Sequence, residues 1–246
     1  MRYFILFAHP EPEHSFNAAM LRHGVDRLRE AGHEVVVSDL YSMNFNPLAS
    51  GADFKGRRFP ERLQYDREQK HAVQHDLLAD DIKAEIEKLL WCDIFVMQFP
   101  LYWHTMPAIM KGWLDRVLVN TVIYGQGKRY ETGGLKGRRG MVATTTGAYE
   151  AMFEPDGLLG DYNRTLWPIH NGVLFYTGLE VVPPFLAYSP VHSDQARNDE
   201  TIAAYGEALL AASTATPMKF HPLTDFGPDF RMRADVEPAS DGHYRR

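Results

Sequence analysis

The sequence predicts an α/β fold, a doubly wound parallel sheet of five strands with helices on both faces. Short apolar runs, typical of buried strands, alternate along the chain with longer segments of helical periodicity. Several of these runs pass through a polar turn into a helical pattern, as a strand does when it enters a crossover helix. This succession favours a parallel sheet, because right-handed crossovers bring the carboxyl ends of the strands to one edge.

The first unit lies at the amino terminus. Residues 3–7 are an apolar run, and residues 16–31 have helical spacing, with Ser15 as a candidate N-cap and Gly32 as a helix stop. Residues 34–37 contain three consecutive valines and predict a short buried strand. The segment 40–74 that follows is polar, aromatic and rich in turns, and it is too long for a plain connection.

The later elements alternate in the same way. Their expected order is helix 75–90, strand 93–99, helix 106–119, strand 140–145, helix 162–177, strand 180–188 and helix 196–213. Apolar residues three or four positions apart, such as Ile82, Ile86 and Leu89, predict the helices. The strand 180–188 is expected to continue past the pair Pro183–Pro184.

A chain of 246 residues is most simply one domain, which we expect to span residues 1–213. The remaining 214–246 form a C-terminal extension with several prolines and charges. It is either a disordered tail or a segment that packs on the domain or on a second subunit. Its aromatic residues favour packing, and they are Phe220, Phe226, Phe230 and Tyr244.

Composition excludes several classes of function. A formal net charge of -6 gives no reason to expect nucleic acid as a partner. The single cysteine, Cys92, excludes an intrachain disulfide and fits a reducing compartment, where a buried small hydrophobe is its expected role. No stretch is apolar and long enough for insertion into a membrane, and the amino terminus lacks a signal-peptide layout. We therefore expect a cytoplasmic protein.

The common hydrolase and metal motifs are missing from the sequence. There is no Gly-x-Ser-x-Gly elbow, no His-Glu-x-x-His and no paired Cys-x-x-Cys. His71 and His75 have helical spacing but no evident third ligand, so a solvated helix face explains them better than a metal site. We expect no bound metal.

The turn after the first strand, residues 9–17, is a candidate phosphate site. A helix N-terminus offers unpaired backbone N–H groups and the positive end of the helix dipole, and the Ser15 hydroxyl could turn to a phosphate oxygen. The glycines of a dinucleotide fingerprint and the Lys-Ser/Thr of a P-loop are absent. An ordinary strand–helix connection capped by Ser15 explains this turn equally well.

Two further strand ends contain residues that could bind a ligand. Residues 98–107 combine flat apolar side chains with a turn set by proline, the kind of wall on which a fused ring such as isoalloxazine stacks. Residues 144–149 form a polar turn whose N–H groups could face the edge of a flavin where negative charge develops on reduction. Core aromatics and ordinary strand-end polarity are the alternatives. Three such loops on one sheet edge favour a flavin.

The sequence motifs resemble those of a known family, the NAD(P)H:quinone oxidoreductases of the DT-diaphorase type. The resemblance runs in order from about residue 3 to about residue 200, and the tail beyond 213 matches only loosely. It rests on Ala8-His9 with Ser15-Phe16-Asn17, SDLYSMNFNP at 38–47, FPLYW at 99–103, PAIMKGW at 107–113, TTG at 145–147 and LWPI at 166–169.

This resemblance implies a flavodoxin-like homodimer that binds FAD at the strand ends, with the flavin near the subunit interface. It implies a ping-pong cycle in which NAD(P)H delivers a hydride to flavin N5 and a quinone then takes it. The implied cofactor-binding residues are His9, Ser15, Phe16, Asn17, Gln64, Pro100, Leu101, Tyr102, Trp103, His104, Thr145, Thr146, Gly147, Ala148 and Arg197. The implied substrate-binding positions are Tyr124, Gln126 and Phe153, with Tyr124 contributed by the partner subunit.

The chain departs from the family at several of these positions. The Tyr and His that are thought to stabilise the charged reduced flavin align with Phe153 and Leu159, which can donate neither a proton nor a hydrogen bond. A second substrate-lining tyrosine becomes Gln126, and a phenylalanine beside the flavin becomes His104. Hydride transfer needs no protein base if backbone N–H groups and solvent handle the charge. The catalytic residues therefore stay unassigned.

The resulting hypothesis is an FAD-dependent NAD(P)H:quinone oxidoreductase. An FMN-dependent reductase of azo or nitro compounds is the alternative within flavoenzymes, although the 40–74 loop with Gln64 and the Tyr124 region favour FAD. A flavin-binding regulatory subunit of an ion-efflux system is the alternative from another class, and the loss of polar groups at Phe153 and Leu159 favours it.

Overall fold

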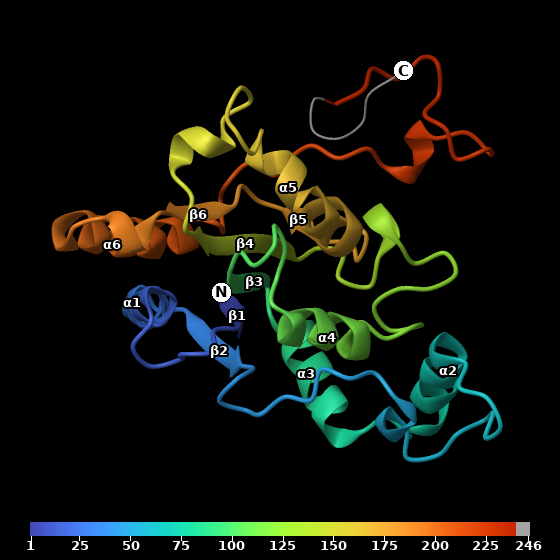
Figure 1. Cartoon of the computed structure of the whole chain (residues 1–246). Coiled ribbons are helices and arrows are strands. Elements are labelled where there is room, and N and C mark those ends of the chain that lie inside the picture. The colour runs from blue at the N-terminus through green and yellow to red at the C-terminus, as the bar shows by residue number, and fades with distance from the viewer. Residues whose placement is uncertain (240–246) are drawn as a thin grey trace.

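The computed structural model describes residues 1–239 and shows a parallel sheet between two layers of helices (Figure 1). The sheet order is β2-β1-β3-β4-β5, and β6 also pairs with β4 in parallel. The strands are β1 Arg2–Phe7, β2 Glu34–Asp39, β3 Ile94–Pro100, β4 Arg139–Thr146, β5 Glu180–Val181 and β6 Phe185–Tyr188. The predicted α/β class and doubly wound topology are confirmed.

The expected fifth strand is divided in two. β5 and β6 pair with the beginning and the end of β4, and Pro183 and Pro184 lie between them. Proline has no backbone N–H to donate to a neighbouring strand, so the pair interrupts the hydrogen bonds to β4. The chain still runs in the same direction after the interruption. β6 then carries the chain on to the same sheet edge at which β4 ends.

Two helices cover one face of the sheet, α1 Phe16–Glu30 and α6 Gln195–Ala211. They approach so closely that a Cβ atom at Gly24 would lie 2.6 Å from Leu209 Cδ1. The other face carries α3 Asp80–Trp91, α4 Ala108–Val117 and α5 Tyr162–Ile169. The layers place the N-termini of α1 and α6 beside the carboxyl ends of the strands.

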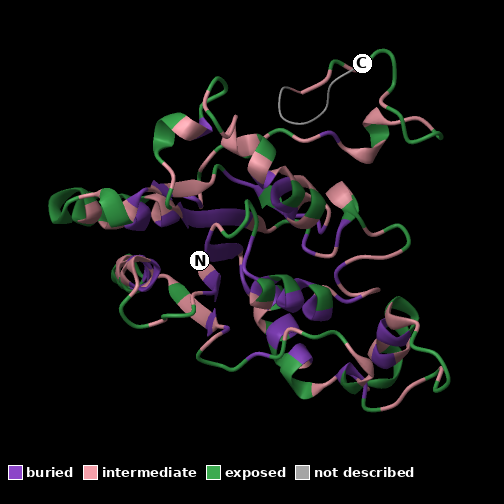
Figure 2. Cartoon of the chain, in the orientation of Figure 1, coloured by how far each residue is buried: buried purple, intermediate pink, exposed green. Residues whose placement is uncertain are grey.

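Each layer has its own hydrophobic core, built from alternate residues of the strands. In β1, Phe4 and Leu6 face the α3 and α4 layer, whereas Tyr3 and Ile5 face α1 and α6. All four side chains are fully buried, and the strands form a buried centre in Figure 2. Strands covered on both faces have apolar residues at successive positions, which is why the sequence shows runs rather than alternation.

The structure corrects the prediction for residues 40–90. The expected helix 75–90 corresponds to α3, which begins only at Asp80. A further helix, α2 Tyr65–His75, precedes it and ends at Asp76, which is in the left-handed conformation at φ 56°. α2 lies inside the segment that the sequence indicates is irregular. Its buried side chains include Glu68, which accepts hydrogen bonds from the N–H groups of Arg58 and Phe59. A helix that buries polar side chains lacks the apolar periodicity on which the prediction depends.

The expected helix 162–177 also differs in detail. The α-helical part ends at Ile169, and residues His170–Phe175 continue as a π-helix. Pro168 lies inside α5 and cannot donate a hydrogen bond to the preceding turn. The missing N–H and the bulk of the proline ring disturb the α-helical hydrogen bonds at the point where the wider π-helix begins.

The tail packs against the domain as far as it is described. The ring of Phe220 stacks on Phe175, with centroids 5.0 Å apart, and the Leu223 N–H donates to Glu131 Oε1 at 3.0 Å. Tyr244 lies outside the described residues.

Cys92 is a buried free thiol. Within residues 1–239, no helix is long and apolar enough to cross a membrane, and no group of side chains could hold a metal ion.

Candidate functional site

A cavity of about 310 Å³ lies at the carboxyl edge of the sheet. It brings together the ends of β1, β3 and β4, which are the three strand ends that the sequence singles out. The end of β6 supplies a fourth wall. The lining residues are His9, Ser15, Phe16, Asn17, Pro100, Leu101, Tyr102, Thr145, Thr146, Gly147, Pro190 and Val191.

The N-terminus of α1 forms the first wall. Ser15 is the N-cap, and its Oγ accepts a hydrogen bond from the Ala18 N–H at 3.1 Å. The Phe16 and Asn17 N–H groups have no protein acceptor in the described chain. His9 Nδ1 accepts from the Glu11 N–H at 3.0 Å, which fixes the turn before the helix. Free N–H groups at the positive end of a helix suit an anionic ligand.

A buried polar network supports this helix end from beneath. Asn17 Nδ2 donates to Thr145 Oγ1 at 2.7 Å, and Gln98 Nε2 donates to the Asn17 carbonyl oxygen at 2.8 Å. Tyr205 donates its hydroxyl proton to Gln98 Oε1 at 2.9 Å, and burial raises the Tyr205 pKa so that this donor stays protonated. Asn17 Oδ1 is buried and unpartnered within residues 1–239. This unpartnered acceptor therefore belongs to a residue that lines the cavity.

The loop after β3 supplies the apolar wall. Leu101 is held by its N–H, which donates to the Thr145 carbonyl oxygen at 2.8 Å. Beyond it, Tyr102 and Thr105 exchange two backbone hydrogen bonds around Trp103 and His104, whose φ angles of 51° and 59° are left-handed. A turn with two positive φ angles usually contains Asn or Gly, so bulky residues here are strained. The turn leaves the Trp103 side chain 95% exposed.

The polar wall comes from the end of β4. Gly147 is exposed, and a Cβ atom there would meet no neighbouring atom within 4 Å. The Ala148 N–H donates to Thr146 Oγ1 at 3.2 Å. That bond already occupies one of the N–H groups that the sequence assigns to a ligand.

The fourth wall is absent from the sequence-based expectation. Ser189 has a left-handed backbone at φ 50° and donates its N–H to the Thr146 carbonyl oxygen at 2.8 Å. This turn brings Pro190 and Val191 to the cavity. The available signal was the Ser-Pro pair at the end of the last strand pattern, because that strand end reaches the same sheet edge.

Several predicted residues lie outside this cavity in the single chain. Gln64 is the N-cap residue of α2, and Arg197 lies in the first turn of α6, where its guanidinium pairs with Glu200 at 3.6 Å. Gln126 is exposed in the loop after α4, and Tyr124 lies in the same loop. Trp103, His104 and Ala148 belong to the lining loops but do not line the cavity themselves.

The positions that replace the family's polar pair lie in an apolar setting. Phe153 is buried, with its ring centroid 6.0 Å from that of Tyr188, and Leu159 donates its N–H to the Met152 carbonyl oxygen. Burial, reinforced by Glu150, raises the pKa of Tyr188 to about 12, so its hydroxyl is neutral at physiological pH. Neither Phe153 nor Leu159 lines the cavity.

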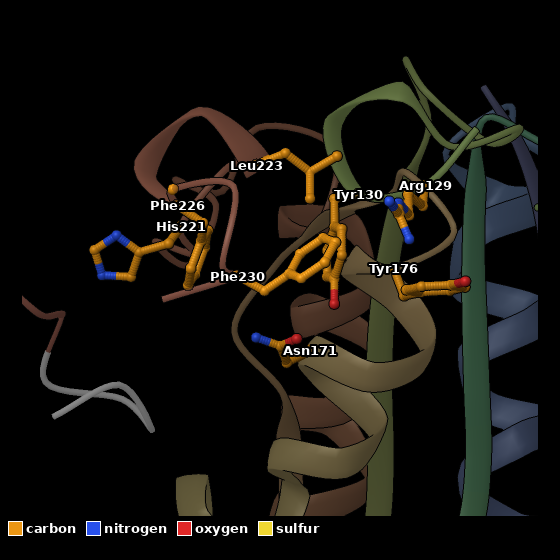
Figure 3. Close-up of a pocket in the computed structure, with 9 residues that line it drawn as sticks. Arg129, Tyr130, Asn171, Tyr176, His221, Leu223, Phe226 and Phe230 are labelled. Carbon is orange, nitrogen blue, oxygen red and sulfur yellow. The ribbon is translucent and has the colours of Figure 1, made fainter. Parts of the chain in front are cut away.

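A second cavity, of about 400 Å³, lies between the π-helix and the tail (Figure 3). Its walls are largely aromatic, with one guanidinium from Arg129. The ring of Tyr176 in this cavity is 6.3 Å from the ring of Tyr124. The aromatic residues of the tail were the sequence signal for this cavity, which is lined by Arg129, Tyr130, Asn171, Tyr176, His221, Leu223, Phe226, Gly227 and Phe230.

Comparison with known proteins agrees with this arrangement. A family model described as a flavodoxin-like fold matches residues 1–211. The chain is 38% identical over 231 residues to NAD(P)H dehydrogenase (quinone) 1 of Rattus norvegicus, covering 94% of this chain and 84% of the rat protein. It is 36% identical over 206 residues to ribosyldihydronicotinamide dehydrogenase (quinone) of Homo sapiens, with coverages of 83% and 89%.

A solved structure is similar over the whole fold. It is a crystal structure from Klebsiella pneumoniae that bears the provisional name quinone reductase, and the TM-score is 0.91 at 34% identity. The match covers 99% of this chain and 98% of the Klebsiella chain. The chain therefore belongs to the family of flavodoxin-like proteins that includes the NAD(P)H dehydrogenases (quinone).

Proposed function

We propose that this protein is an FAD-dependent NAD(P)H:quinone oxidoreductase that acts as a homodimer. The observation that carries the proposal is the cavity at the sheet edge. It combines a helix N-terminus with unpaired N–H groups, an apolar wall at Pro100–Tyr102 and a polar wall at Thr145–Gly147. The named relatives, which are quinone dehydrogenases at 36–38% identity, support the same activity.

The residues present fit a flavin nucleotide. The free N–H groups of Phe16 and Asn17 suit a phosphate group. The buried, unpartnered Asn17 Oδ1 suits a ligand that brings its own hydrogen-bond donor. Pro100 and Leu101 offer a flat apolar surface beside these polar groups, as a fused ring requires.

A bound flavin would accept a hydride from NAD(P)H and pass it to a quinone in two separate half-reactions. The contribution of this chain is to bind and orient. Thr145 and Asn17 are held by their mutual hydrogen bond, so the polar wall and the helix end keep one relative position. Phe153 and Leu159 have no polar group that could stabilise the negative charge that forms at the flavin edge. The backbone N–H groups near Thr146 and Gly147 would stabilise that charge instead.

The dimer would complete the site. Trp103 is 95% exposed although it is a large aromatic residue, and such exposure often marks an interaction surface. Tyr124 lies beside Tyr176 and hence beside the second cavity. We propose that the Tyr124 and Gln126 loop of one protomer, with this aromatic cavity, faces the flavin of the other protomer and receives the quinone. Gln64 would contact the nucleotide, and Arg197 would lie near its adenosine end.

The absorbance spectrum of the purified protein tests this proposal first. We expect a yellow protein that releases FAD on denaturation, sediments as a dimer and oxidises NAD(P)H only when a quinone is present. A colourless protein that binds no flavin at micromolar concentration would refute the enzyme assignment. Tighter binding of FMN than of FAD, with turnover of azo or nitro compounds, would favour the alternative reductase.

One observation favours the regulatory alternative. The loop that would carry the family's polar pair instead buries Phe153 against Tyr188. A flavin-binding subunit of an ion-efflux system would bind FAD but show no quinone-dependent turnover. Steady-state oxidation of NAD(P)H with a soluble quinone separates the two functions.

We also propose a cytoplasmic location, since the one cysteine, Cys92, is a buried free thiol that fits a reducing compartment.

A further inference from the structure

The second cavity has one permanently charged side chain, that of Arg129, among its aromatic rings. Figure 3 shows Arg129, Tyr130 and Tyr176 on one side of the cavity and the tail residues Phe226 and Phe230 on the other. The volume of about 400 Å³ lies within the range of small-molecule sites. The cavity therefore combines flat apolar surfaces with a positive charge.

The backbone that carries this charge is held in place. The Arg129 N–H donates to Thr132 Oγ1 at 3.2 Å, and the Thr132 hydroxyl donates to the Arg129 carbonyl oxygen at 2.7 Å. The next residue, Tyr130, donates its N–H to the Tyr176 carbonyl oxygen at 2.8 Å. These bonds fix the loop against the end of the π-helix. The Arg129 guanidinium itself donates to no protein acceptor within residues 1–239.

The charged neighbours of Arg129 in sequence are engaged elsewhere. Both carboxylate oxygens of Glu131 accept from the Leu223 N–H, at 3.0 and 3.1 Å, so Glu131 holds the tail. Lys128 Nζ donates to two backbone carbonyl oxygens of its own loop, the shorter bond being 2.8 Å. Neither side chain forms an ion pair with Arg129 in the described chain.

The carboxylates of the tail also have donors of their own. His221 Nε2 accepts from the Ala239 N–H at 2.8 Å, which places the ring proton on Nδ1. That Nδ1 donates to Asp225 Oδ2 at 2.8 Å. Asp229 Oδ1 accepts from the Arg231 N–H at 3.2 Å. Within residues 1–239, the Arg129 charge therefore has no counter-ion from the tail.

Two aromatic residues of the cavity have strained backbones. Tyr130 and Phe230 are in the left-handed region, at φ 49° and 60°, which bulky residues seldom adopt. Such conformations persist only where the surrounding structure holds them, and they are concentrated at ligand sites. The Phe230 side chain is also 72% exposed, so a ligand in the cavity would cover a large ring that is open to solvent.

We infer that this cavity binds planar aromatic molecules that carry an acidic group, with Arg129 as the counter-ion. A guanidinium pairs with a carboxylate or sulfonate through charge-assisted hydrogen bonds, and these are stronger where neighbouring rings exclude water. The rings of Tyr130, Tyr176 and Phe230 would contact the flat part of the ligand. That the ligand is a quinone rests on the proposed function, for which acidic quinones then become the preferred acceptors.

Binding of two redox-inert ligands to the purified full-length protein tests this assignment. 2-Naphthoate and 2-naphthamide share one ring system and differ by a single negative charge, and isothermal titration calorimetry gives the Kd of each. We expect Arg129→Gln to raise the Kd for 2-naphthoate on the order of tenfold, because a hydrogen bond to a charged group is lost. The Kd for 2-naphthamide should stay close to the wild-type value.

Three further variants locate the ligand. Arg129→Lys keeps the positive charge and should give a Kd for 2-naphthoate between those of wild type and Arg129→Gln. Phe230→Ala removes ring surface and should weaken both ligands by a similar factor. Arg29→Gln makes a matched charge change at an exposed residue in the last turn of α1, outside the cavity, and should alter neither Kd. Thermal unfolding confirms that each variant is folded.

Steady-state turnover extends the test to quinones. With NAD(P)H saturating, Arg129→Gln should raise the KM for 1,4-naphthoquinone-2-sulfonate on the order of tenfold and leave the KM for 1,4-naphthoquinone nearly unchanged. The kcat values should change little, since the lost contact binds the acceptor equally in the ground state and the transition state.

The possible outcomes are distinct. A selective loss of affinity for the acidic ligand supports the assignment. Equal losses for both ligands would show that Arg129 acts through packing, and no loss would show that the acid binds elsewhere; either result would overturn it. So would a wild-type protein that binds 2-naphthoate no more tightly than 2-naphthamide. A protein that binds 2-naphthoate through Arg129 but reduces no quinone would refute the proposed enzyme and leave this binding site in place.

Discussion

Asn17 Nδ2 lies 2.7 Å from Thr145 Oγ1, and the two residues are 128 positions apart in sequence. This bond ties the start of α1 to the end of β4, so two walls of the candidate site cannot move independently. Both side chains are buried, and the Gln98 amide holds the same Asn17 through its carbonyl oxygen. The geometry of the site is therefore set by a buried network and not by the flexibility of its loops.

We expect Asn17→Ala to lower the free energy of unfolding by about 1–3 kcal/mol, because it leaves the Thr145 hydroxyl buried without its partner. Flavin affinity should fall with it. Thr145→Val removes the same bond from the other side, and the double variant completes a thermodynamic cycle. Urea unfolding of the four proteins should give a coupling energy of about 1 kcal/mol. Strict additivity would show that the bond contributes nothing.

Trp103→Ala should separate stability from binding. Because the side chain is 95% exposed, we expect the free energy of unfolding to stay within about 0.5 kcal/mol of wild type. Flavin affinity should fall by about 1 kcal/mol if the ring covers the cofactor in the dimer. Trp113→Ala is the control, since a fully buried tryptophan should cost about 3–5 kcal/mol of stability. Unchanged flavin affinity would remove Trp103 from the site.

The double variant with Phe153→Tyr and Leu159→His restores the family's polar pair. We expect flavin reduction by NAD(P)H to become faster below about pH 6.5, where an imidazolium would stabilise the negative charge. The gain should disappear as pH rises and the imidazole loses its proton. Stopped-flow absorbance isolates this half-reaction from quinone binding, with Phe153→Tyr alone as control. An unchanged rate and pH profile with flavin still bound would mean that neither group reaches the reacting edge.

His170 should make the fold sensitive to acid. Burial lowers its pKa to about 4, and its Nε2 has no partner in the described chain. Between about pH 6.5 and pH 4 the unfolded chain binds a proton that the folded state does not, so stability falls as pH falls through this window. The loss should reach about 2 kcal/mol at pH 5 and be absent above pH 7.

His170→Leu should abolish that loss, and urea unfolding at pH 7 and pH 5 measures it. The variant should be more stable than wild type at pH 5 but not at pH 7. His14→Leu serves as the control, because it removes a histidine whose side chain is 83% exposed and leaves His170 in place. Equal pH dependence of wild type and His170→Leu would show that His170 accepts a proton in the folded state.

The local pattern of apolar residues was sufficient to predict the sheet with its two helix layers and three of the four walls of the cavity. Strands covered on both faces must be apolar at successive positions, so β1, β3 and β4 are visible as runs such as residues 3–7. A parallel sheet then requires their carboxyl ends to share one edge. The sequence by itself thus determined that the loops beginning at His9, Pro100 and Thr145 would converge.

Only the tertiary structure decided where α2 forms and how the site is closed. α2 is held by the buried Glu68 and the Arg58 and Phe59 N–H groups, which leaves no apolar periodicity to detect. The fourth wall depends on the left-handed turn at Ser189, which brings Pro190 and Val191 to the cavity. Such contacts between distant segments follow from three-dimensional packing, because residues far apart in a chain carry no local signal of their proximity.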